Sequence, residues 1–335
     1  MPQLLERTAL GKRQDLSDVM HVADKKKTPF FTAVKKGTKP MNTLTEWPLD
    51  SYPAPTNKGA IDEQDVQSWE NLSGPDAVLQ GRLQIFERKP KVSRMAELVA
   101  NQAGIGPRKA YAKAVAKGLV MIVRDIELTS LGDQDSKLGT GKDGAQFRGL
   151  GKWISSTAQG DLPVPAAYLP SAAAIYTGAL ADLTDDSITA VLQAIYDKTG
   201  DDEMQLMGFT GSAAKRQVSR LTQFVKDQAG FTPVRRYNSD NGDTITSKVD
   251  ILETDFGQVI LRLSSFINAS GDPTSAASKR LSHFVNMETA SMRFAENPNA
   301  EELPNMGGGR RALIQAIGTL EIGNPLFNGG LQPAS

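Results

Sequence analysis

The stretch PRKAYAKAVAKGLVMIVRDIELTSL, residues 107–131, is the clearest structural signal in the sequence. It opens with a proline and is followed by Gly132, an arrangement typical of a helix start and a helix end. On a 100° helical wheel, five apolar side chains fall within an arc of about 80° and four basic ones fall on the opposite side. The apolar set is Tyr111, Val115, Leu119, Ile122 and Ile126, and the basic set is Lys109, Lys113, Lys117 and Arg124. The stretch therefore predicts one long amphipathic helix of about 37 Å.

The chain before this helix predicts a two-stranded excursion over residues 41–92. NTLTEWPL (42–49) and RLQIFERKP (82–90) both show the alternation suited to strands. The residues between them are mostly polar and acidic, with several prolines and glycines. Because an isolated hairpin of this kind is only marginally stable in water, we expect it to leave the body of the protein and lie on a neighbouring molecule.

A basic segment precedes the excursion. Residues 25–39 contain six lysines and no acid, with Phe30 and Phe31 among them. Pro29 disfavours helix at the residue before it, so the segment is predicted to be extended. Residues 15–23, DLSDVMHVA, predict a short helix ahead of it.

The chain after the long helix mixes helices and strands without regular alternation. A glycine-rich loop is predicted for 133–160, helices for DDSITAVLQAIYDKTG (185–200) and SAAKRQVSRLTQFV (212–225), and a buried strand for EMQLMGFTG (203–211). VDILETDFGQVILRLS (249–264) predicts a hairpin, and ALIQAIGTLEIGNP (312–325) a last strand. This irregular order favours an α+β fold over a doubly wound sheet.

Charge is balanced overall but segregated along the chain. The 38 basic and 38 acidic residues give a net charge of zero, whereas a dedicated nucleic-acid-binding protein is usually basic. Residues 49–78 carry six acids against one lysine, and residues 81–124 carry ten basic groups against two acids. Residues 161–206 carry eight acids against one lysine. One interpretation is solvated faces; the other is that opposite blocks meet between copies of the protein.

Apparent catalytic and cofactor motifs lack the context that their chemistry requires. Gly139, Gly141 and Gly144 spell G-x-G-x-x-G, but a helix precedes the pattern where a dinucleotide site needs a strand. The kinase-like Asp255-Phe256-Gly257 has no accompanying phosphate loop or catalytic loop and predicts a hairpin turn.

Other catalytic and metal chemistry is equally unsupported. The chain has no cysteine, and its two histidines, His21 and His283, are far apart in sequence. The acidic pairs at 185–186 and 201–203 lack the spacing of a calcium loop. We therefore predict no catalytic, cofactor-binding or metal residues, no cofactor and no enzyme activity. No secretory signal and no membrane span are expected either, because the longest strongly apolar run is residues 119–123.

The order of these parts resembles the major capsid protein of tailed bacteriophages, the Hong Kong 97 (HK-97) fold. The resemblance extends over almost the whole chain and includes four short motifs in order. These are Thr28-Pro29-Phe30, Thr45-Glu46-Trp47, Thr254-Asp255-Phe256-Gly257 and Asn324-Pro325. Each motif is weak alone, but their joint order makes the resemblance specific.

The resemblance implies a layout of five parts. Residues 1–40 would form the N-terminal arm and 41–92 the E-loop. Residues 93–159 would form the P domain, with the spine helix at 107–131. Residues 160–300 would be mostly the A domain, and 301–335 would form a C-terminal strand returning to the P domain. Some relatives cross-link lysine to asparagine between subunits; Lys58 lies in the E-loop, but no partner asparagine can be identified.

The resemblance also implies partners. The protein would assemble as hexamers and pentamers of itself into an icosahedral head enclosing double-stranded DNA without sequence specificity. A portal, scaffold, protease or decoration protein would be further partners, with the virion as the final location and the host cytoplasm as the place of assembly. We predict subunit contacts at Phe30, Phe31, Trp47, Trp69 and Phe86, and a basic face toward DNA or a neighbour at Lys109, Lys113, Lys117 and Arg124.

Two other functions remain open from the sequence. An encapsulin-like compartment uses the same fold around a protein cargo. A nucleic-acid-binding protein would use the basic arm of residues 25–39 and would show salt-sensitive DNA affinity as a monomer or dimer.

Overall fold

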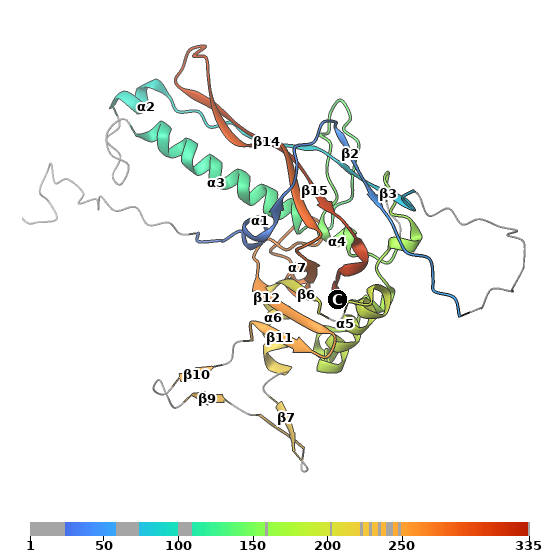
Figure 1. Cartoon of the computed structure of the whole chain (residues 1–335). Helices are drawn as coiled ribbons and strands as arrows, with labels where there is room; N and C mark the ends of the chain where they lie inside the picture. Colours follow the sequence, from blue (N-terminus) through green and yellow to red (C-terminus); the bar gives the residue numbers. More distant parts are fainter. Residues whose placement is uncertain are drawn as a thin grey trace, which may run out of the picture.

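The computed structural model is built around two larger sheets, of four and six strands, with a long helix beside the first and a two-stranded hairpin next to it (Figure 1). The predicted mixture of helices and strands is confirmed. The predicted helix at 15–23 lies outside the described residues. These residues are 24–57, 74–99, 109–157, 160–201, 203–221, 224–227, 230–233, 236–238, 244–246 and 249–333.

The first sheet has four strands in the order β1-β14-β15-β4. Its centre is the long antiparallel hairpin of β14 (Ala290–Leu303) and β15 (Arg311–Ile322), visible at the top of Figure 1. β4 (Gln84–Arg88) pairs with the outer edge of β15, and β1 (Lys35–Lys36) pairs in parallel with β14. The predicted last strand, β15, is therefore confirmed.

The long helix α3 (Ala110–Ser130) lies against this sheet and confirms the helix predicted from 107–131. Ile122 and Ile126 are fully buried, as their place on the apolar face requires. Gly118 permits a close approach, because a Cβ atom there would lie 2.3 Å from Cδ1 of Ile314 on β15. The apolar face of the wheel is thus the packing face of the helix.

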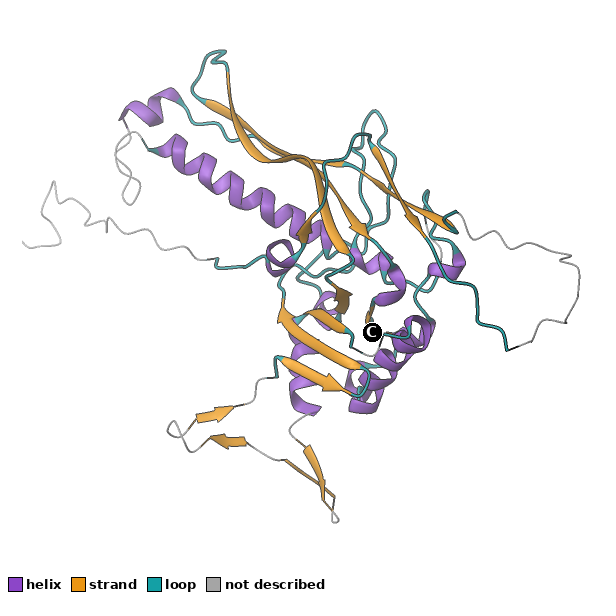
Figure 2. Ribbon diagram, viewed as in Figure 1, coloured by secondary structure: helices purple, strands orange, loops and turns teal. Residues whose placement is uncertain are grey.

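The projecting hairpin consists of β2 (Leu44–Leu49) and β3 (Ala77–Arg82), paired from Leu44–Arg82 to Leu49–Ala77. Leu79 is buried in the same hydrophobic core as α3, so the base of the hairpin is anchored to the first sheet. Residues 50–57 follow β2 as loop at the right of Figure 2.

The strand partner predicted for β2 is wrong. RLQIFERKP (82–90) was predicted to pair with NTLTEWPL, but its strand, β4, pairs with β15 in the first sheet. The partner of β2 is instead β3, AVLQGR, which was interpreted as polar connection. The reason is that alternation marks a segment as a strand without indicating which strand it pairs with.

The second sheet has six strands of mixed direction, in the order β11-β12-β6-β13-β16-β5. Its central strand β6 pairs in parallel with β12 and antiparallel with β13. The strands are β5 (Ile175–Tyr176), β6 (Gln205–Thr210), β11 (Ile251–Thr254), β12 (Gly257–Leu263), β13 (Ser282–Asn286) and β16 (Gly329–Leu331). Both the buried strand predicted at 203–211 and the hairpin predicted at 249–264 are confirmed.

The helices α5 (Asp185–Thr199) and α6 (Ser212–Leu221) pack beside the second sheet. The side chain of Thr184 caps α5 by accepting a hydrogen bond from the backbone N–H of Ser187, and Gly200 ends the helix with a left-handed φ of 69°. The helix predicted for 185–200 is confirmed, and the one predicted for 212–225 is confirmed as far as Leu221. Its predicted end is wrong, because Phe224 and Val225 lie in the strand β7 (Phe224–Asp227).

The shorter elements complete the chain. Four are helices: α1 (Pro29–Ala33), α2 (Arg94–Val99), α4 (Leu150–Trp153) and α7 (Ala276–Arg280). The prediction that residues 25–39 are extended is wrong at α1, because proline disfavours helix at the residue before it but is compatible with the first turn of a helix. Two small hairpins follow α6, formed by β7 (Phe224–Asp227) with β8 (Gly230–Pro233) and by β9 (Arg236–Asn238) with β10 (Thr244–Thr246). The G-x-G-x-x-G pattern lies in a loop between the bridged residues Lys137 and Gln146, as predicted.

Sheet membership crosses the ranges that the resemblance implied for the domains. β4 lies in the range given to the E-loop and most of β14 in the range given to the A domain, yet both belong to the first sheet. Conversely, β16 lies near the C-terminus but belongs to the second sheet. The division of the chain into arm, E-loop, P domain and A domain remains a proposal.

The turn between β11 and β12 gives a first testable prediction. Gly257 has a φ of 132°, and a Cβ atom there would lie 2.4 Å from the backbone oxygen of Met204. We expect Gly257→Ala to lower the free energy of unfolding by about 1–3 kcal/mol, because alanine adds both strain and a backbone clash. Chemical denaturation measures this loss. Gly141→Ala is the control, since no atom lies within 4 Å of its Cβ position, and an equal effect in both variants would contradict the prediction.

Candidate assembly surfaces

The described start of the arm is held by a buried carboxylate on the long helix. Glu127 of α3 is fully buried and accepts hydrogen bonds from the backbone N–H groups of Phe30 (3.0 Å) and Phe31 (2.7 Å) in α1. Burial raises the pKa of Glu127 to about 7, although the two N–H donors act in the opposite direction. No sequence pattern indicated a role for Glu127.

Two more contacts fix the arm on either side of α1. Before it, Arg124 forms a 3.0 Å ion pair with Asp24 and donates a hydrogen bond to the backbone oxygen of Lys26. After it, the backbone N–H of Gly37 donates to the oxygen of Met292, next to the β1–β14 pairing. The arm is therefore attached to α3 and to the first sheet over residues 24–38.

Aromatic contacts join the arm to both sheets. Phe30 is fully buried, and its ring makes an edge contact with Phe209 of the second sheet at a centroid distance of 5.2 Å. Phe31 is half-buried against Phe294 of the first sheet at 6.2 Å. Phe30 is therefore covered by residues of its own chain, whereas Phe31 keeps part of its surface exposed.

The aromatic residues predicted at subunit contacts within the E-loop range also pack inside the chain. Trp47 is 6% exposed, donates a hydrogen bond from Nε1 to the backbone oxygen of Ile322 at 3.0 Å, and packs against Trp153. Phe86, also 6% exposed, contacts Phe147. Trp69 lies outside the described residues. A single subunit does not test contacts with a neighbour, so that role stays a prediction.

The basic residues of α3 do not form one uniform surface. Lys109 and Lys117 are exposed, whereas Lys113 and Arg124 are half-buried. Arg124 is engaged with the arm, as described above. The segment of the basic face near Arg124 is thus covered by the arm, and the exposed cations of this face are Lys109 and Lys117.

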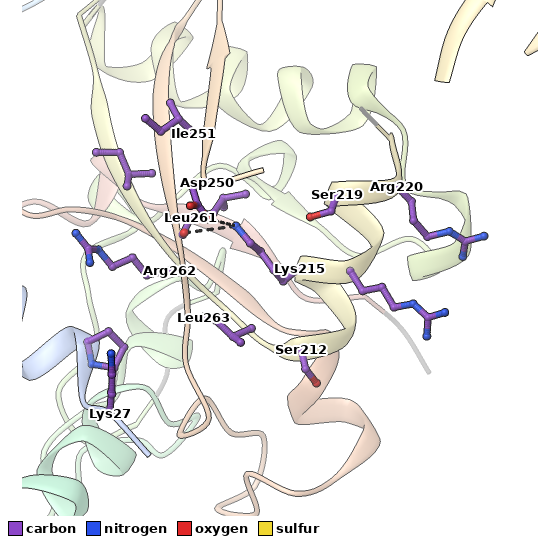
Figure 3. Close-up of a pocket in the computed structure, with 13 residues that line it drawn as sticks. Lys27, Ser212, Lys215, Ser219, Arg220, Asp250, Ile251, Leu261, Arg262 and Leu263 are labelled. Carbon is purple, nitrogen blue, oxygen red and sulfur yellow. Dashed lines mark hydrogen bonds and ion pairs between the residues drawn. The ribbon is translucent and has the colours of Figure 1, made fainter. Parts of the chain in front are cut away.

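A cationic groove lies between the arm and the second sheet. Its volume is about 1050 Å³, and Figure 3 shows Lys27 and Arg262 on one side with Ser212, Ser219 and Arg220 of α6 on the other. The groove is lined by Lys27, Pro29, Ser212, Lys215, Arg216, Ser219, Arg220, Asp250, Ile251, Ile260, Leu261, Arg262 and Leu263. We refer to this surface as the cationic groove.

Lys215 has a structural role within the groove. Its ammonium group donates to the backbone oxygens of Val249 and Leu261 and pairs with Asp250 at 3.4 Å, which ties α6 to β11 and β12. No sequence pattern indicated the groove, because its cations come from three separate segments of the chain: Lys27, residues 215–220 and Arg262.

The described residues provide no constellation for catalysis or metal binding. His283 is buried, and burial lowers its pKa to about 4, so the imidazole is neutral at physiological pH. Within the described ranges, no group of three His, Cys, Asp or Glu side chains is placed to hold a metal ion. Nor does any helix in this part of the chain have the length and apolarity of a membrane span. The prominent surfaces are therefore the arm, the hairpin and the cationic groove.

Solved phage capsids have the same fold. The capsid of the cyanophage P-SCSP1u matches 99% of this chain and 97% of its own with a TM-score of 0.59 at 10% identity. A structure from Mycobacterium phage Bobi gives 0.58 at 11% identity over 97% and 96%. The capsid of the Myoviridae phage XM1 gives 0.57 at 9% identity over 99% of both chains. The chain therefore has the HK-97-type capsid fold, as the resemblance implied.

The family follows from the sequence. The model of the SU10 major capsid protein family matches residues 5–333. A search of curated proteins found no match. The chain belongs to the SU10 major capsid protein family, which is a family of structural proteins and not of enzymes.

Proposed function

We propose that this major capsid protein assembles as hexamers and pentamers of itself into the icosahedral head of a tailed phage, around double-stranded DNA. The observation that carries the proposal is the match of nearly the whole chain to a capsid family and to capsid structures. The subunit would be divided into the N-terminal arm, E-loop, P domain and A domain. A portal and either a scaffold, a protease or a decoration protein complete the head, which assembles in the host cytoplasm.

The projecting parts support self-assembly. The β2–β3 hairpin packs on the core through Trp47, Leu49 and Leu79, and residues 50–57 continue beyond it as exposed loop. An isolated hairpin is only marginally stable in water, so this core contact supports it. Stable subunit contacts bury about 1,600 Å² each. Segments that extend from the body of the subunit can supply this area without a larger hydrophobic core. Lys58 has no identified partner, so no covalent cross-link is proposed.

Sedimentation and negative-stain microscopy of the purified protein test the proposal. We expect capsomers or closed shells in place of a 36.1 kDa species. A monomer or dimer with salt-sensitive DNA affinity would contradict it and favour a DNA-binding protein. Double-stranded DNA in particles purified from a phage infection supports the head assignment, whereas an enzyme cargo would indicate an encapsulin-like compartment.

The basic side of α3 gives a second testable prediction. We expect glutamine at Lys109, Lys113, Lys117 and Arg124 to reduce either DNA retention or assembly, because removing cations weakens attraction to phosphate or to acids of a neighbour. Measurement of packaged DNA per particle separates the two effects. The single variant Arg124→Gln is the matched control for loss of the arm contact alone, and normally filled particles from the quadruple variant would contradict the prediction.

A further inference from the structure

The cationic groove carries positive charge that its own chain does not neutralise. Among the residues that the structure describes, no salt bridge joins an acid to four of its exposed cations, which are Lys27, Arg216, Arg220 and Arg262. The acid among the lining residues, Asp250, is paired with Lys215. An anionic partner therefore meets an excess of positive charge in this groove.

The positive charge continues into a second hollow beside the groove. This hollow has a volume of about 900 Å³ and shares Lys27 and Ser212 with the groove. It adds three further lysines, Lys25, Lys26 and Lys279, and its acid, Asp24, is paired with Arg124. We refer to the groove and this hollow together as the cationic track.

The arm places the cationic track next to the basic face of α3. Arg124 of that face donates a hydrogen bond to the backbone oxygen of Lys26, so the neighbouring lysines of the arm lie beside the helix. Lys109 and Lys117 continue the exposed charge along the same face of α3. A partner that covers this charge is therefore a long anion and not a small one.

The residues that line the track favour a phosphate backbone over a protein surface. Protein interfaces are enriched in aromatic residues, Met and Arg and are depleted in Lys. The described lining of the two hollows contains five lysines and three arginines, but no aromatic residue and no Met. Nucleic-acid interfaces are polar and strongly positive, and the exposed hydroxyl groups of Ser212 and Ser265 can donate to phosphate oxygens.

The same composition also selects the form of nucleic acid. Proteins that bind single strands combine a cationic groove with aromatic side chains on which the bases stack. The described lining of the track has cations and hydroxyl groups but no such stacking surface. A duplex, whose bases are already stacked on one another, presents its phosphates and sugars to a surface of this kind. Contacts to phosphate and sugar do not read the base sequence.

We propose that the cationic track binds the phosphate backbone of double-stranded DNA. The inference rests on the proposed function and assigns the packaged DNA a site on each subunit. Lys27 and Arg262 contact phosphates from one side of the groove and Arg220 of α6 from the other (Figure 3). The site is complete only when the arm is docked on α3, because the arm supplies the lysines at positions 25–27.

Anisotropy of a short fluorescent DNA duplex, measured over a range of salt concentrations, tests the site on the full-length protein before it closes into shells. We expect Arg216→Gln/Arg220→Gln/Arg262→Gln to bind the duplex about ten-fold or more weakly at about 0.15 M salt. The slope of log affinity against log salt is expected to become less steep by about two to three, since each lost phosphate contact removes about 0.9.

A matched control removes the same charge elsewhere. Lys91→Gln/Lys142→Gln/Lys198→Gln changes three exposed lysines outside the track and is expected to keep the slope of the parent protein. Equal losses in the groove variant and this control would overturn the site.

A second variant tests the arm side of the track. Lys25→Gln/Lys26→Gln/Lys27→Gln changes exposed side chains only, and we expect it to reduce affinity and slope as the groove variant does. We also expect the parent protein to bind the duplex more tightly than a single strand of the same length. Tighter binding of the single strand, or an arm variant that binds the duplex as the parent does, would contradict the proposal.

Particle yield separates this inference from the proposed function. We expect the groove variant to form particles in the yield of the parent, because the track contacts DNA and not a neighbouring subunit. A fall in yield with unchanged duplex affinity would show that the track binds an acidic surface of another subunit, and the DNA site would be wrong. If the unmodified chain forms no particles, the proposed function fails, whereas the binding measurements still decide whether the track is a DNA site.

Discussion

Replacing Trp47 with alanine is expected to lower the free energy of unfolding of the subunit by about 3–5 kcal/mol, the range for removal of a buried tryptophan. The indole is 6% exposed at the base of the β2–β3 hairpin. Its N–H donates to the backbone oxygen of Ile322 at 3.0 Å, and its ring lies 5.9 Å from that of Trp153. The change therefore removes the contact that anchors the hairpin to the first sheet, together with a buried hydrogen bond.

Chemical denaturation, monitored by circular dichroism, measures the loss of unfolding free energy, and a particle assembly assay measures any effect on assembly. Tyr52→Ala is the matched control, because this aromatic side chain is fully exposed in the segment that follows β2. We expect a change within about 0.5 kcal/mol for the control. If Trp47→Ala leaves subunit stability unchanged but prevents assembly, Trp47 acts at a subunit contact and the intrachain explanation is wrong.

Elements with a local signal were predicted well. The helix α3 follows from the apolar side chains on one face of a wheel, and α5 from the periodic apolar side chains of residues 185–200, which end in a glycine. The hairpin at Gly257 follows from its turn residues. In each case the residues that determine the element are neighbours in sequence, so the physical cause is visible in the sequence itself.

Strand partners were not predictable in the same way. β3 contains Gly81, which lowers its apparent strand signal, yet a Cβ atom there would lie only 3.2 Å from Oγ1 of Thr45 and 3.3 Å from the ring of Trp47. The glycine is thus explained by a cross-strand contact with residues more than thirty positions away. Pairing of this kind depends on the tertiary structure, which alternation does not encode.

The arm contact was missed for a related reason. On the wheel, Glu127 falls on the same side as the lysines and Arg124, a side that gives no indication of burial. The structure instead places the arm over this end of the helix and buries Glu127. The only signal in the sequence was a single acid on an otherwise basic face. The position of residues 24–38 over this face explains why the acid is buried.

Replacing Glu127 with alanine is expected to release the arm. The change leaves the buried N–H of Phe30 and the N–H of Phe31 without acceptors, at a cost of about 1–3 kcal/mol for each group. Trypsin cleavage at Lys25, Lys26 and Lys27 measures the release, and we expect it to be faster in the variant. Glu301→Ala, which removes an exposed acid from β14, is the control, and equal cleavage rates in the two variants would contradict the prediction.

The same carboxyl group is expected to make stability depend on pH. Burial raises the pKa of Glu127 from an ordinary 4.5 to about 7, so between these values the folded state binds more protons than the unfolded state. Stability contributed by this group is therefore present below pH 4.5 and is lost as the pH rises through 7. The shift corresponds to roughly 3 kcal/mol.

His283 opposes this dependence, so the parent protein alone would conceal it. Burial lowers the pKa of His283 from 6.5 to about 4, and between these values the unfolded state binds more protons, so stability rises with pH. The difference in unfolding free energy between the parent and Glu127→Gln cancels the histidine contribution, because both proteins contain it. We expect that difference to change by roughly 3 kcal/mol between pH 5 and pH 8 in favour of the glutamine variant at high pH. A difference that stays constant over this range would show that Glu127 does not change its charge there, and the arm would then be held by a carboxylate that is ionised throughout.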